Sequence, residues 1–456
     1  MSLNIIVLAA GEGKRMQSRL PKVLHPLAGR SLLSHVIHTA RELQPQQLIV
    51  VIGHAGEAVR AAFTADTAIT WVEQTERLGT GHAVQQALPH VDAHARVLVL
   101  YGDVPLMRAD TLRALVAASD TGLAILTARS EDAGNYGRIV RNQQGAVQRI
   151  IEARDATTEE RAIQEWNTGV LCAPAVRLAQ WLSRVTRHNA QGEYYLTDVI
   201  ALAVAEGVPV STVHPTRVAD VEGVNSKREL AMLEAVYRRD QADGLLAAGV
   251  TLADPARIDV RGQLQCARDV EIDVNCVFEE HVTLGEGVRI GPNCVLRNVS
   301  IAAGTQVLAY SMLDGAQVGA NCRIGPYARL RPGAQLEADV HIGNFVEVKA
   351  SHIGAGSKAN HLAYVGDSSV GQRVNIGAGT ITCNYDGVNK HRTIIEDDCF
   401  IGSDATLVAP VTIARGSYVG AGSTISKDTP PGQLTVARAK QISLPSWKPP
   451  AKKTKG

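Results

Sequence analysis

Two glycines and two cations near the start of the chain have the spacing of a turn that could hold phosphate groups. Gly11 and Gly13 follow a short apolar run, and Arg15 and Lys22 come soon after them. Glycine lets backbone N–H groups approach phosphate oxygens, and cationic side chains neutralise their charge. A dinucleotide-binding fingerprint would need a third glycine where Met16 stands, and the spacing of a P-loop is also missing. The pattern predicts a phosphate-binding turn of another kind, with an ordinary tight turn as the alternative.

A second loop and a carboxylate add to this phosphate chemistry. Gln74 precedes a loop at residues 78–83 that contains Gly79 and Thr80, and Asp103 follows another short apolar run. Carboxylate oxygens are ligands that Mg²⁺ prefers, and Mg²⁺ bridges phosphate groups in many transfer reactions. An aspartate in this position could equally cap a helix.

The C-terminal half contains a different set of residues that could do chemistry. Arg331 and Lys349 could hold an anion, and His361 follows Lys349 by 12 residues. Histidine side chains titrate near pH 6.5, so a neutral imidazole can accept a proton from an amine at neutral pH. Any one of the 14 histidines is more often structural than catalytic, so His361 is a candidate base because of its neighbours.

The candidate phosphate-binding residues of the N-terminal half must be positioned by the secondary structure around them. In this half of the chain, short apolar runs alternate with amphipathic segments. The predicted elements are strands at residues 5–9, 47–52 and 97–101 and helices at residues 32–42 and 82–88. This alternation is typical of an α/β fold with a mostly parallel sheet covered by helices. Ligands of such sheets bind beyond the carboxyl ends of the strands, where Gly11 and Asp103 are expected.

Residues 226–248 predict one long helix that connects the two halves. Leu230, Leu233, Val236 and Tyr237 recur at helical spacing among charged residues, and Gly249 would end the helix.

An aliphatic or aromatic residue recurs at every sixth position after residue 251. Glycine often follows it, and a period of six is typical of a parallel β-helix built from hexapeptide repeats. Three hexapeptides make one coil, and the recurring side chain stacks inside a triangular prism. The three runs are Ile272, Phe278, Leu284, Ile290 and Leu296; Val318, Ile324, Leu330, Leu336, Ile342 and Val348; and Ile395, Ile401, Leu407, Ile413, Val419 and Ile425.

The repeat places Arg331 and Lys349 in successive coils, because they are 18 residues apart. Two neighbouring cations are costly unless they surround an anion such as a sugar phosphate. The repeat frame slips between Leu296 and Val318 and again between Val348 and Ile395, and the second slip holds a polar stretch that is a good place for function. Open ends and flat faces also favour self-association.

Composition excludes several classes of protein. The 456 residues carry 46 Lys and Arg against 45 Asp and Glu, a net charge of +1 that excludes a broadly basic nucleic-acid binder. No apolar run is long enough for a membrane span or a signal peptide. Seven cysteines without a C-x-x-C pair indicate a reducing compartment, so we expect a cytoplasmic protein without nucleic-acid or membrane partners.

Together the motifs of both halves resemble one family over nearly the whole chain, the bacterial bifunctional N-acetylglucosamine-1-phosphate uridyltransferase/glucosamine-1-phosphate acetyltransferases. The resemblance implies an α/β protein with an N-terminal Rossmann-like nucleotidyltransferase domain, a connecting helix and a C-terminal left-handed parallel β-helix of hexapeptide repeats. The implied segments are residues 1–225, the linker helix 226–250, the acetyltransferase domain 251–442 and a basic Pro-rich tail 443–456. The motifs that carry it are the glycine-rich turn with Lys22, residues 78–83, 102–103, 135–138, 151–152, 167–169, 192–198 and 221–225.

For the N-terminal half the resemblance implies attack by N-acetylglucosamine 1-phosphate on the α-phosphorus of UTP, releasing pyrophosphate. Asp103 and Asn225 would bind Mg²⁺, and Arg15 and Lys22 would be the catalytic cations that hold phosphates. Such chemistry is mostly positioning and charge neutralisation, so no protein nucleophile is needed. The implied substrate-binding residues of this half are Ala9, Ala10, Gly11, Gly13, Gln74, Gly79, Thr80, Tyr101, Gly137, Glu152, Asn167 and Asn225, of which Gln74, Gly79 and Thr80 would read the uracil and Gly137, Glu152 and Asn167 would hold the sugar.

For the C-terminal half the resemblance implies acetyl transfer from acetyl-CoA to glucosamine 1-phosphate, with His361 as the base that deprotonates the amine. The implied substrate residues are Arg331, Lys349, Tyr364, Asn375, Asn384 and Tyr385, with Lys390 as a further candidate, and the implied coenzyme A contacts are Ala378, Ser403, Ala421 and Arg438. Small corner residues and an exposed arginine would explain the last four equally well. The family also implies a homotrimer and a role in supplying precursors of peptidoglycan and lipopolysaccharide, and hence in cell shape.

Two alternatives remain at this stage. The chain could be a nucleotidyltransferase whose β-helix only oligomerises or regulates, or a non-enzymatic assembly factor that keeps both folds. The presence of His361 with Arg331 and Lys349 argues against the first, and the combination of Lys22 with Asp103 argues against the second.

Overall fold

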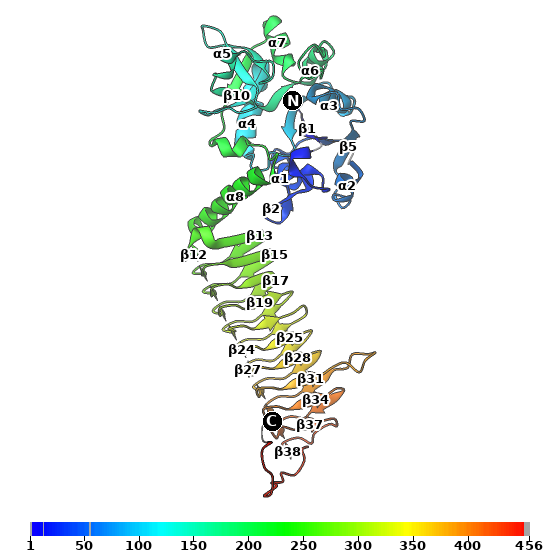
Figure 1. The fold of residues 1–456 in the computed structure, drawn as a ribbon, viewed down its shortest axis with the longest axis vertical. Coiled ribbons are helices and arrows are strands. Elements are labelled where there is room, and N and C mark those ends of the chain that lie inside the picture. The colour runs from blue at the N-terminus through cyan, green and yellow to red at the C-terminus, as the bar shows by residue number, and fades with distance from the viewer. Residues whose placement is uncertain (1, 12, 54–55, 451–456) are drawn as a thin grey trace, which may run out of the picture. The chain divides into compact units, whose positions relative to one another are not determined.

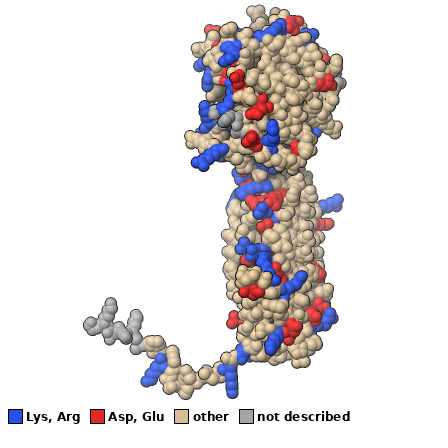
Figure 2. All heavy atoms as spheres, turned by 90° about the vertical axis from the view of Figure 1, so that its right-hand side faces the viewer, with Lys and Arg blue, Asp and Glu red and all other residues tan. Residues whose placement is uncertain are grey.

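The computed structural model describes residues 2–11, 13–53 and 56–450 and divides into two compact units, Met1–Arg238 and Arg239–Gly456 (Figure 1). Of the predicted basic tail, residues 443–450 are exposed without helix or strand, and Lys452, Lys453 and Lys455 lie outside the described residues. Acidic and basic side chains are interspersed on the face of each unit seen in Figure 2, as expected for a net charge near zero.

A mixed sheet forms the centre of the first unit. Its order is β11 (Val210–Val213), β7 (Leu123–Arg129), β10 (Glu165–Pro174), β6 (Arg96–Tyr101), β1 (Leu3–Ala9), β4 (Gln47–Ile52) and β5 (Ile69–Glu73), and the hairpin of β8 (Arg138–Arg141) and β9 (Val147–Ile151) joins β10. The three strands predicted from apolar runs are the parallel neighbours β4, β1 and β6. β10 is antiparallel to both of its neighbours and to β8, so the sheet is more mixed than the sequence alone predicts.

Helices cover both faces of this sheet, as the alternation of side chains along β1 requires. Ile5 and Val7 belong to one buried cluster with residues of α1, and Ile6 and Leu8 belong to a second cluster with residues of α3, α6 and α7. The helices are α1 (Leu32–Arg41), α2 (Gly56–Ala61), α3 (Thr80–Ala87), α4 (Ala109–Ala118), α5 (Thr158–Arg161), α6 (Ala175–Leu182), α7 (Asp198–Ala205) and α8 (Lys227–Ala247). Both predicted helices of this unit and the predicted connecting helix are therefore confirmed.

A buried histidine makes the first unit sensitive to acid. The His35 ring donates from Nε2 to the carbonyl of Leu27 at 2.9 Å and packs edge-on against Tyr237, with ring centroids 5.1 Å apart. Burial lowers the pKa of His35 from 6.5 to about 4. Between these values the unfolded chain binds the proton more tightly than the folded one, so stability falls as the pH drops through this window.

We expect His35 to remove about 2 kcal/mol of stability between pH 7 and pH 5, since one pKa unit corresponds to about 1.4 kcal/mol. Urea unfolding followed by tryptophan fluorescence at both pH values, for wild type and His35→Phe, measures this contribution. The pH dependence of the variant should be smaller by that amount, and identical pH dependence in the two proteins would contradict it.

The second unit is a prism of stacked parallel coils (Figure 1). One face is an 11-stranded sheet: β12 (Thr251–Leu252), β14 (Glu271–Ile272), β16 (Arg289–Ile290), β18 (Gln306–Val307), β21 (Arg323–Ile324), β24 (His341–Asn344), β27 (Lys358–His361), β30 (Asn375–Ile376), β33 (Phe400–Ile401), β36 (Tyr418–Val419) and β38 (Leu434–Thr435).

A 16-stranded sheet supplies the rest of the prism. Its strands are β13 (Ile258–Cys266), β15 (Cys276–Leu284), β17 (Val295–Ile301), β19 (Met312–Asp314), β20 (Gln317–Val318), β22 (Arg329–Leu330), β23 (Gln335–Leu336), β25 (Glu347–Lys349), β26 (His352–Ile353), β28 (Tyr364–Gly366), β29 (Ser368–Val370), β31 (Ile381–Cys383), β32 (Thr393–Ile395), β34 (Thr406–Val408), β35 (Val411–Ile413) and β37 (Thr424–Ile425). All members of the three predicted aliphatic runs are buried in one continuous core.

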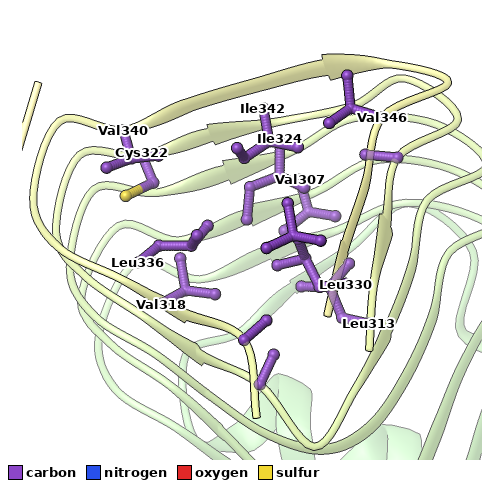
Figure 3. Close-up of a cluster of buried hydrophobic side chains, with 14 of the residues drawn as sticks. Val307, Leu313, Val318, Cys322, Ile324, Leu330, Leu336, Val340, Ile342 and Val346 are labelled. Carbon is purple, nitrogen blue, oxygen red and sulfur yellow. The ribbon is translucent and has the colours of Figure 1, made fainter. Parts of the chain in front are cut away.

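The register between coils explains both slips of the repeat. Val318 lies opposite Leu336 and Ile324 opposite Ile342, an offset of 18 residues (Figure 3). At the first slip Leu296 lies opposite Leu313, an offset of 17, so the coil is one residue shorter. At the second slip Val370 lies opposite Ile395, an offset of 25. In the preceding coil Ile353 lies opposite Val370, an offset of 17. The longer coil therefore holds eight extra residues, which leave the prism as a loop between β31 and β32.

Candidate active sites

The first candidate site lies at the carboxyl ends of two neighbouring strands. Leu8 of β1 lies opposite Tyr101 of β6, so the turn after β1 and the turn after β6 open side by side. A pocket of about 220 Å³ lies between them and the loop before α3. The predicted residues that line it are Ala9, Ala10, Gly11, Lys22, Gln74, Gly79, Thr80, Tyr101 and Asp103, and the others are Leu8, Val23, Arg77, Ala83 and Glu193.

The oxygens of Asp103 and Asn225 converge on one point in this site. The ammonium of Lys22 forms an ion pair with Asp103 and donates to Oδ1 of Asn225 at 3.0 Å. In the described part of the chain, no group of three or more His, Cys, Asp or Glu side chains is arranged for a metal ion. Two protein oxygens fit Mg²⁺, which keeps waters and binds substrate phosphates in its remaining positions.

Gly13 and Arg15 lie beside the pocket rather than in its lining. Gly13 has a φ of 66°, and a Cβ atom on it would come within 2.6 Å of the Lys22 Cβ. Gly13 therefore permits the position of the Lys22 side chain. Arg15 is exposed in the 3₁₀ turn Lys14–Met16 and makes no hydrogen bond or ion pair with the described residues.

Gly13→Ala should displace Lys22 and lower kcat/KM for uridylyl transfer by about 10²-fold, because misplacement of a positioning group by about 1 Å has effects of this size. Gly145→Ala is a matched control, since Gly145 has a φ of 81° but no atom lies within 4 Å of the position that a Cβ would take there. Pyrophosphate release measures the effect. Equal losses in the two variants would show that backbone strain alone is responsible.

The predicted uracil residues are held together before α3. Gln74 is buried, and its amide donates to the carbonyl of Gly79 at 3.0 Å. Gly79 has a φ of 105°, and a Cβ there would come within 2.6 Å of the Tyr194 carbonyl. The Thr80 hydroxyl accepts from the backbone N–H of Leu196 at 3.2 Å. This loop therefore depends on residues 194–196 for its shape.

The predicted sugar residues form a second group near Tyr101. The N–H of Asn167 donates to the carbonyl of Gly137 at 2.8 Å, and a Cβ on Gly137 would lie 3.6 Å from the Glu152 carboxyl carbon. The Thr197 hydroxyl donates to Glu152 at 3.0 Å. Burial raises the pKa of Glu152, and burial together with the charges of Glu152 and Asp103 raises the pKa of Tyr101.

The cationic group of the second unit is gathered at one edge of the prism. Arg331 Nη1 donates to Glu347 at 2.8 Å, and Lys349 pairs with Asp367 at 3.3 Å. Asn384 also donates to Asp367 and lies 3.5 Å from the Tyr364 hydroxyl.

The nearby ammonium of Lys349 lowers the pKa of Lys390, so Lys390 belongs to the same group. Tyr385 is 60% exposed and donates to the carbonyl of Gly387 at 2.5 Å.

His361 lies at the opposite edge of the same face. It ends β27, and the chain then turns into β28, where Gly366 occupies the register position next to Lys349. The three-residue strand β28, about 10 Å long, therefore lies between the edges that hold His361 and Lys349. His361 Nδ1 lies 2.7 Å from Oδ1 of Asn344. Because an amide oxygen only accepts, Nδ1 carries the proton and Nε2 holds the lone pair that a general base needs.

The predicted coenzyme A contacts continue the edge that His361 begins. Asn344 lies opposite His361 in the preceding coil. In the three coils that follow His361, the strand registers place Ala378, Ser403 and Ala421 at the same edge. Arg438 donates to the carbonyl of Ala421 at 2.6 Å. Asn375 starts β30 on the same sheet as His361, and it makes no side-chain hydrogen bond among the described residues.

Several residues of these sites were not singled out by the sequence. Arg77 and Glu193 line the first pocket, Glu347 and Asp367 hold the cations, and Asn344 orients the histidine. For Asn344 a signal existed, since it precedes His361 by 17 residues, the length of one short coil. The two carboxylates could have been found in the same way, as partners 16 and 18 residues from Arg331 and Lys349.

Three family models match separate segments of this chain. The family model for the MobA-like NTP transferase domain matches residues 5–205, the model for a GMPPB C-terminal domain matches residues 260–337, and the bacterial transferase hexapeptide model (six repeats) matches residues 392–427. Among solved structures, a UDP-glucose pyrophosphorylase complexed with UDP-glucose covers 53% of this chain and 100% of its own, with 14% identity and a TM-score of 0.44.

Curated relatives match over nearly the full length. Proteins named "Bifunctional protein GlmU" from Cupriavidus pinatubonensis and Ralstonia nicotianae are 59% and 58% identical over 454 residues, covering 99% of this chain and 100% of each relative. The protein of the same name from Chromobacterium violaceum is 58% identical over 453 residues, covering 99% of both chains.

Proposed function

Because the chain belongs to the family of bifunctional GlmU proteins, we propose that its two candidate sites carry out the two steps that complete UDP-N-acetylglucosamine. The chain is a bifunctional enzyme, a uridyltransferase and an acetyltransferase, with a nucleotidyltransferase domain and a hexapeptide-repeat region. The proposal concerns which residues do the work, and the observation that carries it is the convergence of Lys22, Asp103 and Asn225 beside a pocket.

In the first unit, the phosphate of N-acetylglucosamine 1-phosphate attacks the α-phosphorus of UTP and pyrophosphate leaves. The phosphates are held by the backbone of Ala9, Ala10 and Gly11 and by the side chain of Lys22. Arg15, which is exposed in its turn, also binds them. The loop at Gln74, Gly79 and Thr80 reads the uracil. Gly137, Glu152 and Asn167 hold the sugar beside Tyr101.

Mg²⁺ is the metal that this site would use, held by Asp103 and Asn225. When bound, it neutralises charge on the phosphates of UTP. The ammonium of Lys22, which pairs with Asp103 in this structure, is then available to the phosphates.

In the second unit, Nε2 of His361 accepts a proton from the amine of glucosamine 1-phosphate. The amine attacks the thioester carbonyl of acetyl-CoA, and coenzyme A leaves as the thiol. Arg331, Lys349 and Lys390 hold the sugar phosphate together with Tyr364 and Asn375, and Asn384 and Tyr385 orient the reacting groups. The edge of Ala378, Ser403, Ala421 and Arg438 holds coenzyme A.

We propose that the enzyme works as a homotrimer in which neighbouring copies share the acetyl-transfer sites. His361 and Lys349 lie at opposite edges of one prism face. A second copy that presents its cationic edge to His361 would complete the site, and C₃ packing of three prisms would make three such sites. Light scattering of the purified chain measures this state.

We also propose a cytoplasmic enzyme with small-molecule partners that supplies cell-wall precursors. All seven cysteines are free thiols, which fits a reducing compartment. In the described ranges no helix is both long and apolar enough to span a membrane.

The decisive experiment follows both activities in one preparation. Acetyl-CoA consumption with glucosamine 1-phosphate and pyrophosphate release from UTP with N-acetylglucosamine 1-phosphate should both occur. A folded trimer that releases pyrophosphate but consumes no acetyl-CoA would refute the proposed second site.

A further inference from the structure

Residues 189–197 form a segment that contacts both the predicted uracil loop and the predicted sugar residues. The sequence motif at residues 192–198 has no part in the reaction as described so far. The segment leads into α7, and Glu193 lines the pocket.

On the nucleotide side, the segment is tied to the uracil loop by three hydrogen bonds. The N–H of Gly81 donates to the carbonyl of Tyr194 at 2.8 Å, and the N–H of Tyr194 donates to the carbonyl of Leu78 at 2.7 Å. The N–H of Leu196 donates to the Thr80 hydroxyl at 3.2 Å. All three use backbone groups of the segment, so they do not depend on its side chains.

On the sugar side, the segment uses side chains. The Tyr195 hydroxyl donates to Asp155 at 3.3 Å, and the Thr197 hydroxyl donates to Oε1 of Glu152 at 3.0 Å. Among the described residues, Thr197 is the one hydrogen-bond donor to the Glu152 carboxylate. The titratable groups that interact with it electrostatically include Tyr101, Asp155, Glu193, Tyr195 and Asp198, and none of these carries a positive charge.

The helix that follows Thr197 does not need its hydroxyl. Thr197 precedes α7 with helical backbone angles, φ −62° and ψ −23°, and its side chain accepts no hydrogen bond from the first turn. The N–H groups of Val199 and Ile200 donate to the backbone carbonyls of Leu196 and Thr197, at 3.3 and 3.2 Å. The hydroxyl is therefore free to donate to Glu152.

We propose that Thr197 is a positioning residue for sugar recognition: its hydroxyl fixes the Glu152 carboxylate in the orientation that accepts hydrogen bonds from the hydroxyl groups of the sugar 1-phosphate. This inference rests on the proposed role of Glu152. A carboxylate without its single donor, surrounded by like charges, would turn away or take up a proton and become a weaker acceptor.

The test compares Thr197→Val, which has the same shape without the hydroxyl, with Thr197→Ser, which keeps it. KM is measured for N-acetylglucosamine 1-phosphate at saturating UTP and for UTP at saturating sugar phosphate. The valine variant should raise KM for the sugar phosphate about tenfold and leave KM for UTP within twofold, and the serine variant should be close to wild type. Equal changes in both KM values, or none, would overturn the inference.

Glu152→Gln and the double variant separate this inference from the proposed function. If Glu152→Gln leaves KM for the sugar phosphate unchanged, the proposed role of Glu152 fails, and the inference fails with it. If Glu152→Gln raises that KM but Thr197→Val does not, only the inference fails. If Thr197 acts through Glu152, adding Thr197→Val to Glu152→Gln should produce less than a twofold further change, whereas independent tenfold effects would multiply.

Discussion

Asp103→Asn will lower uridylyl transfer by about 10³-fold and leave acetyl transfer unchanged. An asparagine has nearly the same shape and can still hydrogen bond to Lys22, but it lacks the charge that balances the ammonium and that would hold Mg²⁺. A loss of about 10³ corresponds to about 4 kcal/mol of transition-state stabilisation, within the range for metal-ion charge neutralisation. Pyrophosphate release at increasing Mg²⁺ measures it, and excess metal should restore part of the rate.

Asp110→Asn is the matched control for this prediction. Asp110 lies in the first turn of α4 with its side chain 83% exposed and paired to Arg113, so its removal should leave both activities within twofold of wild type. Uridylyl transfer by Asp103→Asn within tenfold of wild type would exclude Asp103 as a metal ligand. Loss of both activities in the folded variant would contradict two independent sites.

His361→Ala will do the reverse, lowering acetyl transfer by about 10³-fold while uridylyl transfer continues. Removing a general base usually costs 10²- to 10⁴-fold in rate. The amine of glucosamine 1-phosphate is largely protonated at neutral pH, so part of the loss should be recovered at alkaline pH, where solvent removes the proton. Acetyl-CoA consumption from pH 6 to pH 9 measures both effects.

His281→Ala controls for the loss of an imidazole elsewhere on the prism, since His281 is exposed on β15. A weaker version of the catalytic defect should follow from Asn344→Ala, because the ring would lose the acceptor that keeps the proton on Nδ1. Acetyl transfer by His361→Ala that matches the control variant would remove His361 from the mechanism.

The fold could be predicted from the sequence where one physical pattern dominated. Buried parallel strands appear as apolar runs, and a stacked prism needs one inward side chain per hexapeptide, so β1, β4, β6 and the three aliphatic runs were identified. The antiparallel direction of β10 was not, because strand direction depends on the partner and not on the strand's own residues. The slips of the repeat were visible, but their cause required the observed register.

The sequence likewise identified some residues of the candidate sites and missed others. Gly13, Lys22 and Asp103 stand out because a glycine-rich turn and a carboxylate at a strand end have recognisable local chemistry. Asp367 and Thr197 do not, because their roles depend on partners 18 and 45 residues away in the chain. Only the fold shows that the Thr197 hydroxyl donates to the Glu152 carboxylate. The separation of His361 from Lys349 likewise depends on which edge of a prism each residue occupies.

The loop between β31 and β32, residues 384–392, has a consequence for how this protein can change over evolutionary time. The coils above and below it keep their register, with Ile376 opposite Ile401 and Thr382 opposite Leu407. The loop is thus an insertion that the stack tolerates without rearrangement, closed on itself by pairing of Tyr385 with Lys390 and of Asp386 with His391. It can be lengthened, shortened or exchanged as a cassette, so substrate preference in the second unit can drift while its scaffold stays constant.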